Sequence, residues 1–363
     1  MRVMFLGAGA SMHRAYPLTS ELLKHIALEM GSTSSNFDRT AWERFDTFRR
    51  NATGLLRSIL NSNDPEIVLT LPDLLQAAHD RRILGYWNEL ASGSPSDHWW
   101  EDPAMGDLLQ GGQTIKDAFS QVVDSFFSVR HAKEWRNTYD GYFCTALAPL
   151  SQGDTIITTN WDTLAERVLW QMRKWSPRDG YGFPKKFTVS DSSVIPEYSP
   201  VKVLKLHGSV GWFGSAGAIY LRQANYLQYM FGSSIVKDIS APPNEGIPIS
   251  DPVMIFPSYL KQLQGPIFQA IWSQASMALM QAETITVIGY SLPEADMAIR
   301  VLLNPARQRL TEGLVTITVV DKDPLVHDRW RELLGTGVNH IQDSAESYFQ
   351  PPMGNDETPQ TYT

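Results

Sequence analysis

Cysteine is almost absent from this sequence, since Cys144 is the single one among 363 residues. One thiol excludes an intramolecular disulfide and a multi-cysteine zinc site, which favours a reducing compartment such as the cytoplasm. Long apolar runs are also lacking, because no stretch approaches the roughly 18 apolar residues of a membrane-spanning helix. The first residues, MRVMFLGAGAS, contain an apolar run that is shorter than a signal peptide requires. We therefore expect a soluble, cytoplasmic protein that does not enter a membrane, with Cys144 as a buried small hydrophobe.

Excess positive charge is lacking as well, because 31 Lys and Arg residues face 39 Asp and Glu residues and the net charge is −8. An acidic balance gives no general attraction to nucleic acid, so we expect no direct nucleic-acid binding. Hydrophobic residues make up 43% of the chain and charged residues 19%, as in ordinary globular proteins rather than in disordered or membrane chains. The 11 tryptophans indicate thick cores or a sizeable association surface.

Apolar strands alternate with helices along much of the chain. A strand over residues 2–6 meets the glycine turn GAGAS directly, and an amphipathic helical segment follows. Strand-like segments recur as DTIITT, VKVLKL, PVMIFP, TITVIGY and VTITVVD, with helical segments between most of them. This alternation predicts an α/β fold, with a doubly wound, mostly parallel, Rossmann-like sheet that helices cover on both faces.

Several segments interrupt this rhythm. Residues 32–150 carry helical periodicity where the second strand of an α/β fold is expected, so we interpret them as a large helical insertion after the first strand–helix unit. Irregular insertions rich in Pro, Gly and Ser are expected near 176–200 and 213–251. The polar tail 351–363 is expected to be disordered. Residues 1–350, with these insertions included, are then expected to form a single domain.

The first strand ends on glycines, in a position where a doubly wound sheet binds its ligand. A strand, then Gly7 and Gly9, then a helix is a suitable context for cradling a phosphate at a helix N-terminus. Gly9 would let the backbone approach the ligand. The dehydrogenase fingerprint requires a third glycine where Met12 stands, so ordinary hydride transfer is disfavoured. A tight strand–helix turn without a ligand is the alternative.

Polar side chains follow the strand DTIITT. Asn160 and Asp162 lie just beyond it, at the edge of the sheet where ligands bind. A purely structural alternative exists, because Thr163 and Glu166 have the spacing of a capping box and Asp162 can itself be the N-cap of the next helix.

Three further strand ends carry small or polar residues. His207 follows VKVLKL and is either a catalytic group or a turn residue, and Gly208 after it would let the chain turn and leave room for a ligand. Gly289 and Ser291 lie in VIGYSLPEAD, which can also be a routine strand–helix turn. Asp321 ends the last apolar strand, where it suits a ribose hydroxyl or helix capping.

Taken in order, GAG-A-S, T-T-N-x-D, K-L-H-G-S and G-Y-S-L-x-x-x-D resemble the motifs of the sirtuin-like NAD-binding domain. They span the chain from Gly7 to about Asp321, and the helical block corresponds to an insertion typical of that family. The branch that this pattern resembles is that of bacterial sirtuin-like proteins, many of which are NAD-hydrolysing effectors of antiphage defence. The resemblance implies NAD as a substrate and no metal.

The resemblance also implies roles for individual residues. His207 would be the catalytic base near the nicotinamide ribose, with Asn160 and Asp162 bordering the nicotinamide–ribose pocket. The phosphates of NAD and the adjacent ribose would be bound by Gly7, Ala8, Gly9 and Ser11. The adenosine half would be bound by Gly289, Ser291 and Asp321.

Two departures from the family pattern bear on the activity. Pro17 resembles the proline after the glycine turn, but the phenylalanine–arginine pair of true deacetylases is absent. A single cysteine also excludes the four-cysteine zinc module, which helps to hold acetyl-lysine peptides. Both departures favour NAD+ hydrolysis to nicotinamide and ADP-ribose. The alternatives are an NAD-dependent protein deacylase or ADP-ribosyltransferase, and a non-catalytic module that binds NAD or ADP-ribose.

An NAD hydrolase of this kind would be toxic if it were always active. We therefore expect control by homo-oligomerisation through the helical insertion or by a regulatory partner in trans. A DNA-translocating ATPase or an Argonaute-like protein fits the second role.

Overall fold

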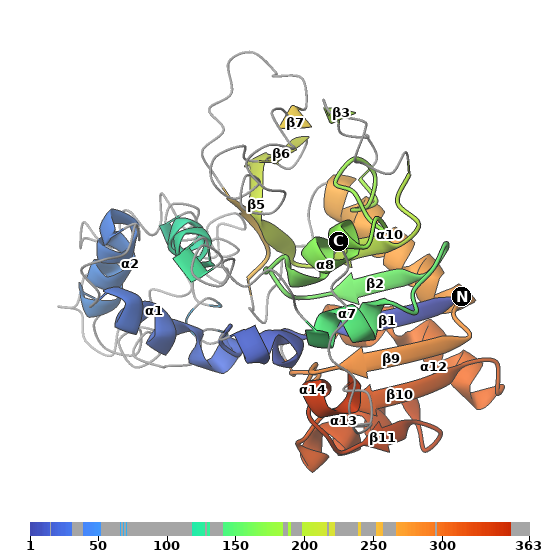
Figure 1. Ribbon diagram of the computed structural model, residues 1–363. Helices are drawn as coiled ribbons and strands as arrows, with labels where there is room; N and C mark the ends of the chain where they lie inside the picture. Colours follow the sequence, from blue (N-terminus) through green and yellow to red (C-terminus); the bar gives the residue numbers. More distant parts are fainter. Residues whose placement is uncertain are drawn as a thin grey trace, which may run out of the picture.

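Six parallel strands form the central sheet within the residues that the computed structural model describes (Figure 1). Their order is β11-β10-β9-β1-β2-β4, and every neighbouring pair is parallel. The strands are β1 (Arg2–Leu6), β2 (Thr155–Thr158), β4 (Lys202–Lys205), β9 (Thr284–Ile288), β10 (Thr316–Val320) and β11 (Asn339–Ile341). The structure describes residues 1–14, 16–30, 39–51, 66, 68, 70, 118–127, 129–130, 141–183, 188–189, 198–215, 218–221, 239–240, 252–256, 266–294 and 296–349.

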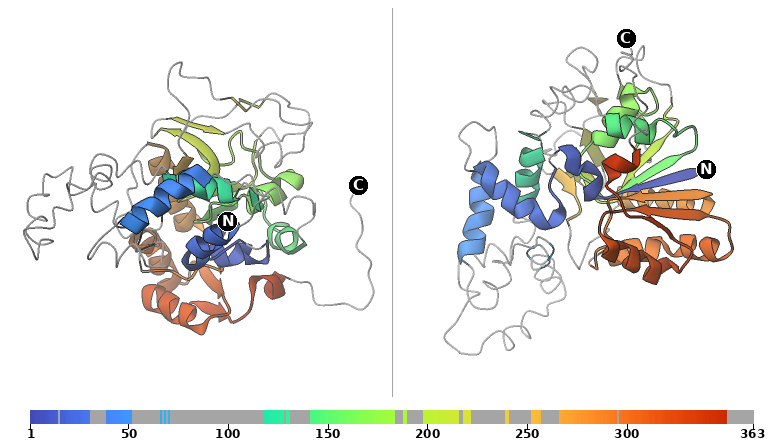
Figure 2. Two further views of the ribbon diagram at one scale, coloured as in Figure 1. Left: turned by 90° about the vertical axis from the view of Figure 1, so that its left-hand side faces the viewer. Right: turned by 60° about the horizontal axis from the view of Figure 1, so that its bottom comes forward.

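Two groups of helices cover the two faces of this sheet (Figures 1 and 2). One face carries α7 (Gly141–Leu147), α8 (Leu164–Gln171) and α14 (Ala345–Phe349). The other carries α10 (Pro266–Gln281), α11 (Met297–Leu302), α12 (Asn304–Thr311) and α13 (Pro324–Leu334). Helices α1 (Leu22–Met30) and α2 (Arg39–Asn51) lie beyond the carboxyl ends of the strands. The predicted doubly wound α/β architecture is therefore confirmed.

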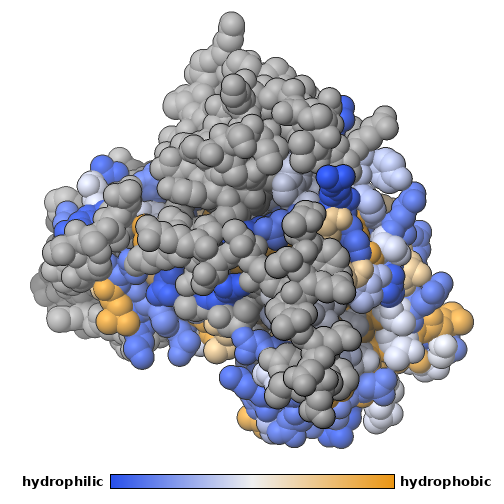
Figure 3. Space-filling model, viewed as in Figure 1, coloured by the Kyte–Doolittle hydropathy of each residue, from blue (hydrophilic) through white to orange (hydrophobic). Residues whose placement is uncertain are grey.

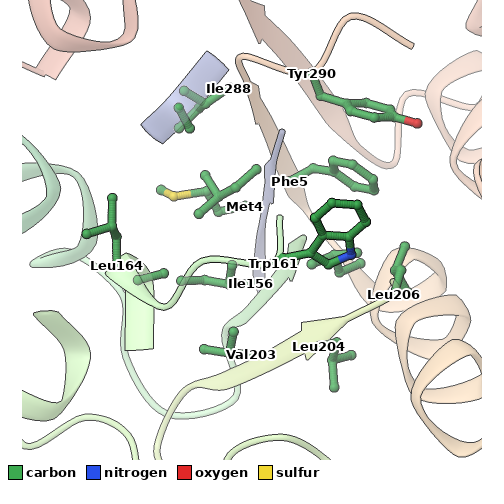
Figure 4. Packing of buried hydrophobic residues seen from close by; sticks show 14 of the residues in the cluster. Met4, Phe5, Ile156, Trp161, Leu164, Val203, Leu204, Leu206, Ile288 and Tyr290 are labelled. Carbon is green, nitrogen blue, oxygen red and sulfur yellow. The ribbon is translucent and has the colours of Figure 1, made fainter. Parts of the chain in front are cut away.

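The sheet strands are apolar because both faces are covered. Phe5, Val287 and Val319 are completely buried, one on each of three adjacent strands. At the carboxyl end of the sheet, Figure 4 shows Phe5 beside Tyr290 and near Trp161, and the Phe5 and Tyr290 rings lie 4.9 Å apart. These aromatic rings pack together beneath the loops that follow the strands.

A small antiparallel sheet lies beside the large one. It contains β5 (Gly208–Ser215), β6 (Ala218–Leu221) and β8 (Pro252–Met254), in the order β6-β5-β8, and a second antiparallel pair joins β3 (Thr188–Val189) to β7 (Ile239–Ser240). The strand in PVMIFP is thus present, but it pairs with β5 rather than with the parallel sheet. The β5–β6 pairing also extends ordered strands into the beginning of the segment 213–251, which we expected to be irregular.

Other differences from the sequence-based predictions are local. The short strand β11 was not predicted, because it contains three residues with no apolar run. The helix expected after GAGAS forms in pieces, as a 3₁₀ helix over Ala8–Arg14, a second one over Thr19–Glu21 and then α1. Helices occupy the described parts of 32–150, but most of that predicted insertion and the tail 351–363 lie outside the described residues.

The described helices were compared with the length and apolar character of a membrane-spanning helix. Among the described helices, none combines the length and the apolar character that crossing a membrane requires. On the face shown in Figure 3, hydrophilic residues predominate among the coloured atoms, and the hydrophobic ones lie in separate groups.

Candidate functional site

A cavity of about 630 Å³ lies at the carboxyl ends of the central strands. This is the size of a typical small-molecule site. The strand order reverses at β1, since the chain proceeds from β1 to β2 and β4 on one side and from β9 to β10 and β11 on the other. Doubly wound sheets bind ligands at such a switch point. The predicted site residues that line the cavity are Ala8, Gly9, Ser11, Asn160, Asp162, His207, Gly289, Ser291 and Asp321.

Two glycine turns meet backbone to backbone beneath this cavity. The Gly9 N–H donates to the Gly289 carbonyl oxygen at 2.9 Å, and the Gly7 N–H donates to that of Ile288 at 3.0 Å. A Cβ at Gly289, whose φ is +60°, would lie 2.3 Å from the Ala10 nitrogen. A Cβ at Gly9 would lie 2.9 Å from Gly289 Cα. The glycines are therefore required by the approach of the two turns to each other, and Gly7 itself does not line the cavity.

Asn160 joins the loop after β2 to the glycine turn. Its Nδ2 donates to the Gly7 carbonyl oxygen at 2.9 Å and to Ser11 Oγ at 3.2 Å. The Ser11 hydroxyl donates in turn to Asp162 Oδ2 at 2.8 Å. Asn160 Oδ1 is buried, and it has no hydrogen-bond partner within the described part of the chain. A buried acceptor without a partner is costly, which makes this oxygen a candidate for a ligand contact.

Asp162 also orders the start of α8. Its Oδ1 accepts the Leu164 N–H at 3.0 Å, but the N-cap of α8 is Thr163, so the alternative that Asp162 is itself the N-cap was wrong. The capping box was wrong, because Thr163 makes no side-chain capping hydrogen bond. Glu166, its expected partner, instead pairs with Lys205.

The Lys205–Glu166 pair is completely enclosed by protein. Lys205 Nζ lies 2.9 Å from Glu166 Oε1, with side-chain exposures of 0% and 1%. Lys205 also donates to the Asp162 carbonyl oxygen, and the Tyr181 hydroxyl donates to Glu166 at 3.3 Å. Burial raises the pKa of Glu166, and the Lys205 ammonium opposes this shift. The sequence analysis gave Glu166 a capping role and missed Lys205, because a lysine in an alternating strand is typical of a solvated face.

His207 lies two residues beyond the end of β4, with 5% of its surface exposed. Its carbonyl oxygen accepts the Trp161 indole N–H at 3.1 Å and the Ile255 N–H at 2.8 Å, which fixes the backbone. The next residue, Gly208, has a φ of +76°, and a Cβ there would lie 2.3 Å from the Val253 carbonyl oxygen. Gly208 therefore accommodates strand β8, which corrects the expectation that it leaves room for a ligand.

Asp296, from the loop before α11, lies close to the imidazole of His207. Its Oδ1 lies 3.9 Å from His207 Nε2, and its Oδ2 accepts the Tyr290 hydroxyl at 2.5 Å. Burial raises the pKa of Tyr290 well above its ordinary value. Asp296 is the final residue of G-Y-S-L-x-x-x-D, so the sequence contained a signal for it that received no role.

Ser291, after β9, and Asp321, after β10, border the cavity. Ser291 is exposed, whereas Asp321 is partly buried and accepts the Asp323 N–H at 2.9 Å. Burial raises the pKa of Asp321. Asp323, rather than Asp321, caps helix α13, because its side chain accepts the Leu325 N–H. The carboxylate of Asp321 is thus left at the cavity edge, where a hydroxyl group of a ligand can reach it.

No cluster of three or more metal-binding side chains occurs in the described part of the chain. The groups that line the cavity include the imidazole of His207, the amide oxygen of Asn160 and several carboxylates, among them those of Asp162, Asp296 and Asp321. Such groups can accept protons and hydrogen bonds from hydroxyl groups and water.

Comparison with protein families gives one match, in which the model described as the SIR2-like domain covers residues 154–338, just over half of the chain. No curated protein matches the sequence. Solved structures with similar folds include a Sir2 homologue–NAD complex, 13% identical, covering 96% of this chain and 86% of that one with a TM-score of 0.41. A mutant Sir2 homologue with 2′-O-acetyl ADP-ribose, also 13% identical, covers 96% and 88% with a TM-score of 0.40. Both TM-scores are below 0.5, so neither structure supports an inference about this chain.

Proposed function

Because this chain belongs to the SIR2-like domain family, we propose that it is an NAD+ hydrolase that releases nicotinamide and ADP-ribose. The observation that carries the proposal is the position of Asn160 and His207 in one cavity at the switch point of the sheet. The buried Oδ1 of Asn160, which has no partner among the described residues, supports a polar ligand there. Family membership supports NAD as that ligand.

The chemistry is cleavage of the bond between nicotinamide and the C1′ carbon of ribose. Nicotinamide is cationic in NAD+, so it leaves as a neutral molecule without a general acid. As in glycoside hydrolysis, the sugar passes through a transition state that resembles an oxocarbenium ion. The protein must then orient the ribose and activate a nucleophile.

The cavity residues suit these two tasks. His207 accepts a proton from a ribose hydroxyl or from the attacking water. Asn160 Oδ1 accepts a hydrogen bond from the same ribose or water, while its Nδ2 stays bonded to the Gly7 carbonyl oxygen. Asp162 borders the nicotinamide, and each carboxylate oxygen keeps a lone pair for the carboxamide N–H groups.

The remaining predicted contacts follow the length of the cavity. We assign the phosphates and the adjacent ribose to the turn formed by Gly7, Ala8, Gly9 and Ser11, where Gly7 acts through the shape of the turn. The adenosine half lies along Gly289, Ser291 and Asp321. The partly buried carboxylate of Asp321 would accept a ribose hydroxyl.

Hydrolysis is favoured over acyl transfer because the chain has one cysteine and so lacks a four-cysteine module. Cys144 is itself buried in α7, away from the residues that line the cavity. One cysteine cannot form a four-cysteine zinc site, which supports hydrolysis over acyl transfer to a bound peptide.

Purified protein with NAD+ and an acetylated peptide, followed by mass spectrometry, tests the proposal. The expected products are nicotinamide and ADP-ribose, and turnover is lost in His207→Ala and Asn160→Ala. His327→Ala is the matched control, because His327 on α13 is only partly buried, stacks on His340 and does not line the cavity. Unchanged turnover in both cavity variants would contradict the assignment, and acetyl-ADP-ribose as the product would favour a deacylase.

We further propose that the hydrolase is a regulated cytoplasmic effector of bacterial antiphage defence. Continuous depletion of NAD+ is toxic, so activity requires control by homo-oligomerisation or by a partner in trans, such as a DNA-translocating ATPase or an Argonaute-like protein. Light scattering combined with activity measurements tests this control. A monomer that is fully active without any partner would contradict it.

A further inference from the structure

Asp296 and His207 form a buried pair in the lining of the cavity. Their side chains are 5% and 7% exposed, respectively, and Asp296 Oδ1 lies 3.9 Å from His207 Nε2. The two residues come from different parts of the fold, His207 from the end of β4 and Asp296 from the start of α11. A carboxylate and an imidazole that approach this closely in a site with little water interact strongly when the imidazole is protonated.

Tyr290 holds Asp296 in this orientation. Its hydroxyl donates to Asp296 Oδ2 at 2.5 Å, which leaves Oδ1 on the side of His207. The tyrosine is itself fixed, because its ring packs 4.9 Å from that of Phe5 and its carbonyl oxygen accepts the Trp330 indole N–H at 3.2 Å. A tyrosine that stays protonated remains a donor, so this anchor does not depend on pH in the neutral range.

The other charged groups around the imidazole are already engaged elsewhere. On the loop before α8, Asp162 accepts from Ser11 and from the Leu164 N–H. On β4 and α8, Lys205 and Glu166 neutralise each other. The guanidinium of Arg300 on α11 donates to the Leu292 carbonyl oxygen.

Glu66 and Asp321 also line the cavity as carboxylates. Glu66 acts electrostatically on Tyr290, and Asp321 accepts the Asp323 N–H.

We propose that Asp296 is a positioning residue for His207, which orients the imidazole and stabilises the imidazolium that forms during NAD+ cleavage. This inference rests on the proposed hydrolase function only for its catalytic consequence. At 3.9 Å the pair is too long for a hydrogen bond, and it shortens when the ring gains its proton.

The step balances without any further reactant. His207 takes the proton of the attacking water, the water oxygen bonds to C1′, and the C1′–nitrogen bond breaks with its electron pair going to nicotinamide. Asp296 stabilises the positive ring until the proton passes to solvent. The net reaction consumes NAD+ and water and yields ADP-ribose, nicotinamide and one proton.

Titration of the His207 ring by NMR tests the inference without relying on activity. The chain has 8 histidines, and loss of one signal in His207→Gln assigns the resonance. Asp296→Asn removes the charge but keeps an oxygen that accepts the Tyr290 hydroxyl, and it is expected to lower the midpoint of the His207 titration by at least about one pH unit. Asp296→Ser is the second variant, in case the asparagine disturbs folding.

Asp343→Asn is the matched control, because Asp343 is another carboxylate that lines the cavity and bonds only locally, to the Ser344 N–H. It is expected to leave the His207 midpoint in place. A folded Asp296 variant with an unchanged midpoint would overturn the inference.

Kinetics then separates the two proposals. If the protein cleaves NAD+, Asp296→Asn is expected to move the acidic limb of the pH profile of kcat/KM to lower pH, by as much as the His207 midpoint moves. It is also expected to lower kcat more than it changes KM. A merely structural role would leave the pH profile in place. If the wild-type protein cleaves no NAD+ but the NMR midpoint still moves, the hydrolase proposal fails and the Asp296–His207 pairing stands.

Discussion

Replacing Lys205 by methionine is expected to destabilise the protein strongly, because it leaves Glu166 buried without its partner. Both side chains are at most 1% exposed and lie 2.9 Å apart. Breaking one side of such a pair costs about 3–5 kcal/mol. The lost hydrogen bond to the Asp162 carbonyl oxygen adds about 1 kcal/mol. Domains of this kind have about 5–15 kcal/mol of stability, so a large share would be lost.

The effect depends on pH in a defined direction. Burial raises the pKa of Glu166, so the folded state binds a proton more tightly than the unfolded chain does. Stability from this group is therefore greatest below the unfolded pKa and falls as the pH rises through the folded one. Without the opposing Lys205, this dependence should be steeper, so Lys205→Met is least destabilising in mild acid.

Urea unfolding followed by tryptophan fluorescence measures both quantities. Lys202→Met is the matched control, because Lys202 lies on the same strand but forms a partly exposed pair with Asp179, worth about 1 kcal/mol or less. The double variant Lys205→Met/Glu166→Leu should regain most of the stability, since apolar residues replace buried ion pairs well. Its NAD+ turnover should nevertheless stay below that of the wild type, because the Asp162 carbonyl oxygen has lost its hydrogen bond from Lys205. A loss below about 1 kcal/mol in Lys205→Met at neutral pH would refute this reasoning.

Three further outcomes are expected. Burial alone would raise the pKa of Asp154, but N–H groups of Arg2 and Ser151 hold this pKa below its ordinary value. The carboxylate therefore stabilises the folded state at a pH above its unfolded pKa, and this contribution is lost as the pH falls through the folded pKa. Asp154→Asn should therefore weaken the acid dependence of the melting temperature, and an unaltered dependence would contradict the assignment. Gly289→Ala should destabilise by more than about 1 kcal/mol in urea unfolding, because its Cβ would lie 2.3 Å from a backbone nitrogen; a neutral result would show that the two turns can separate. Ser11→Ala should lower kcat several-fold with little loss of stability, and full activity would contradict the Asn160 network.

Most of the sheet could be predicted from the sequence because its central strands are rich in apolar, β-branched residues. The segments around β1, β2, β9 and β10 stand out by their runs of Val, Ile and Leu between glycines and polar turns. The strand β11 could not be found this way, because Asn339–Ile341 is partly exposed at the edge of the sheet. The β5–β6 hairpin was hidden by its many glycines and serines, which also occur in irregular segments.

The residues of the candidate site were predictable where they follow a strand. Asn160 and His207 each lie two residues beyond the ends of β2 and β4, so the parallel topology alone brings them to one edge. Asp296 was harder, because it follows the β9 turn at some distance along the chain and meets His207 only through the fold of α11. The burial of Lys205 could not be predicted from its own strand, because it depends on the pairing with Glu166, which lies 39 positions earlier in the sequence.

Product analysis of NAD+ turnover tests the central claim most directly. Wild-type protein, over a wide range of concentrations, is incubated with NAD+ and an acetylated peptide, beside His207→Ala, Asn160→Ala and the control His327→Ala, whose residue lies outside the cavity lining. The proposal predicts equal amounts of nicotinamide and ADP-ribose from the wild type and the control, and none from the two cavity variants. Equal turnover in all four proteins, or NAD+ that stays intact at every concentration, would contradict it.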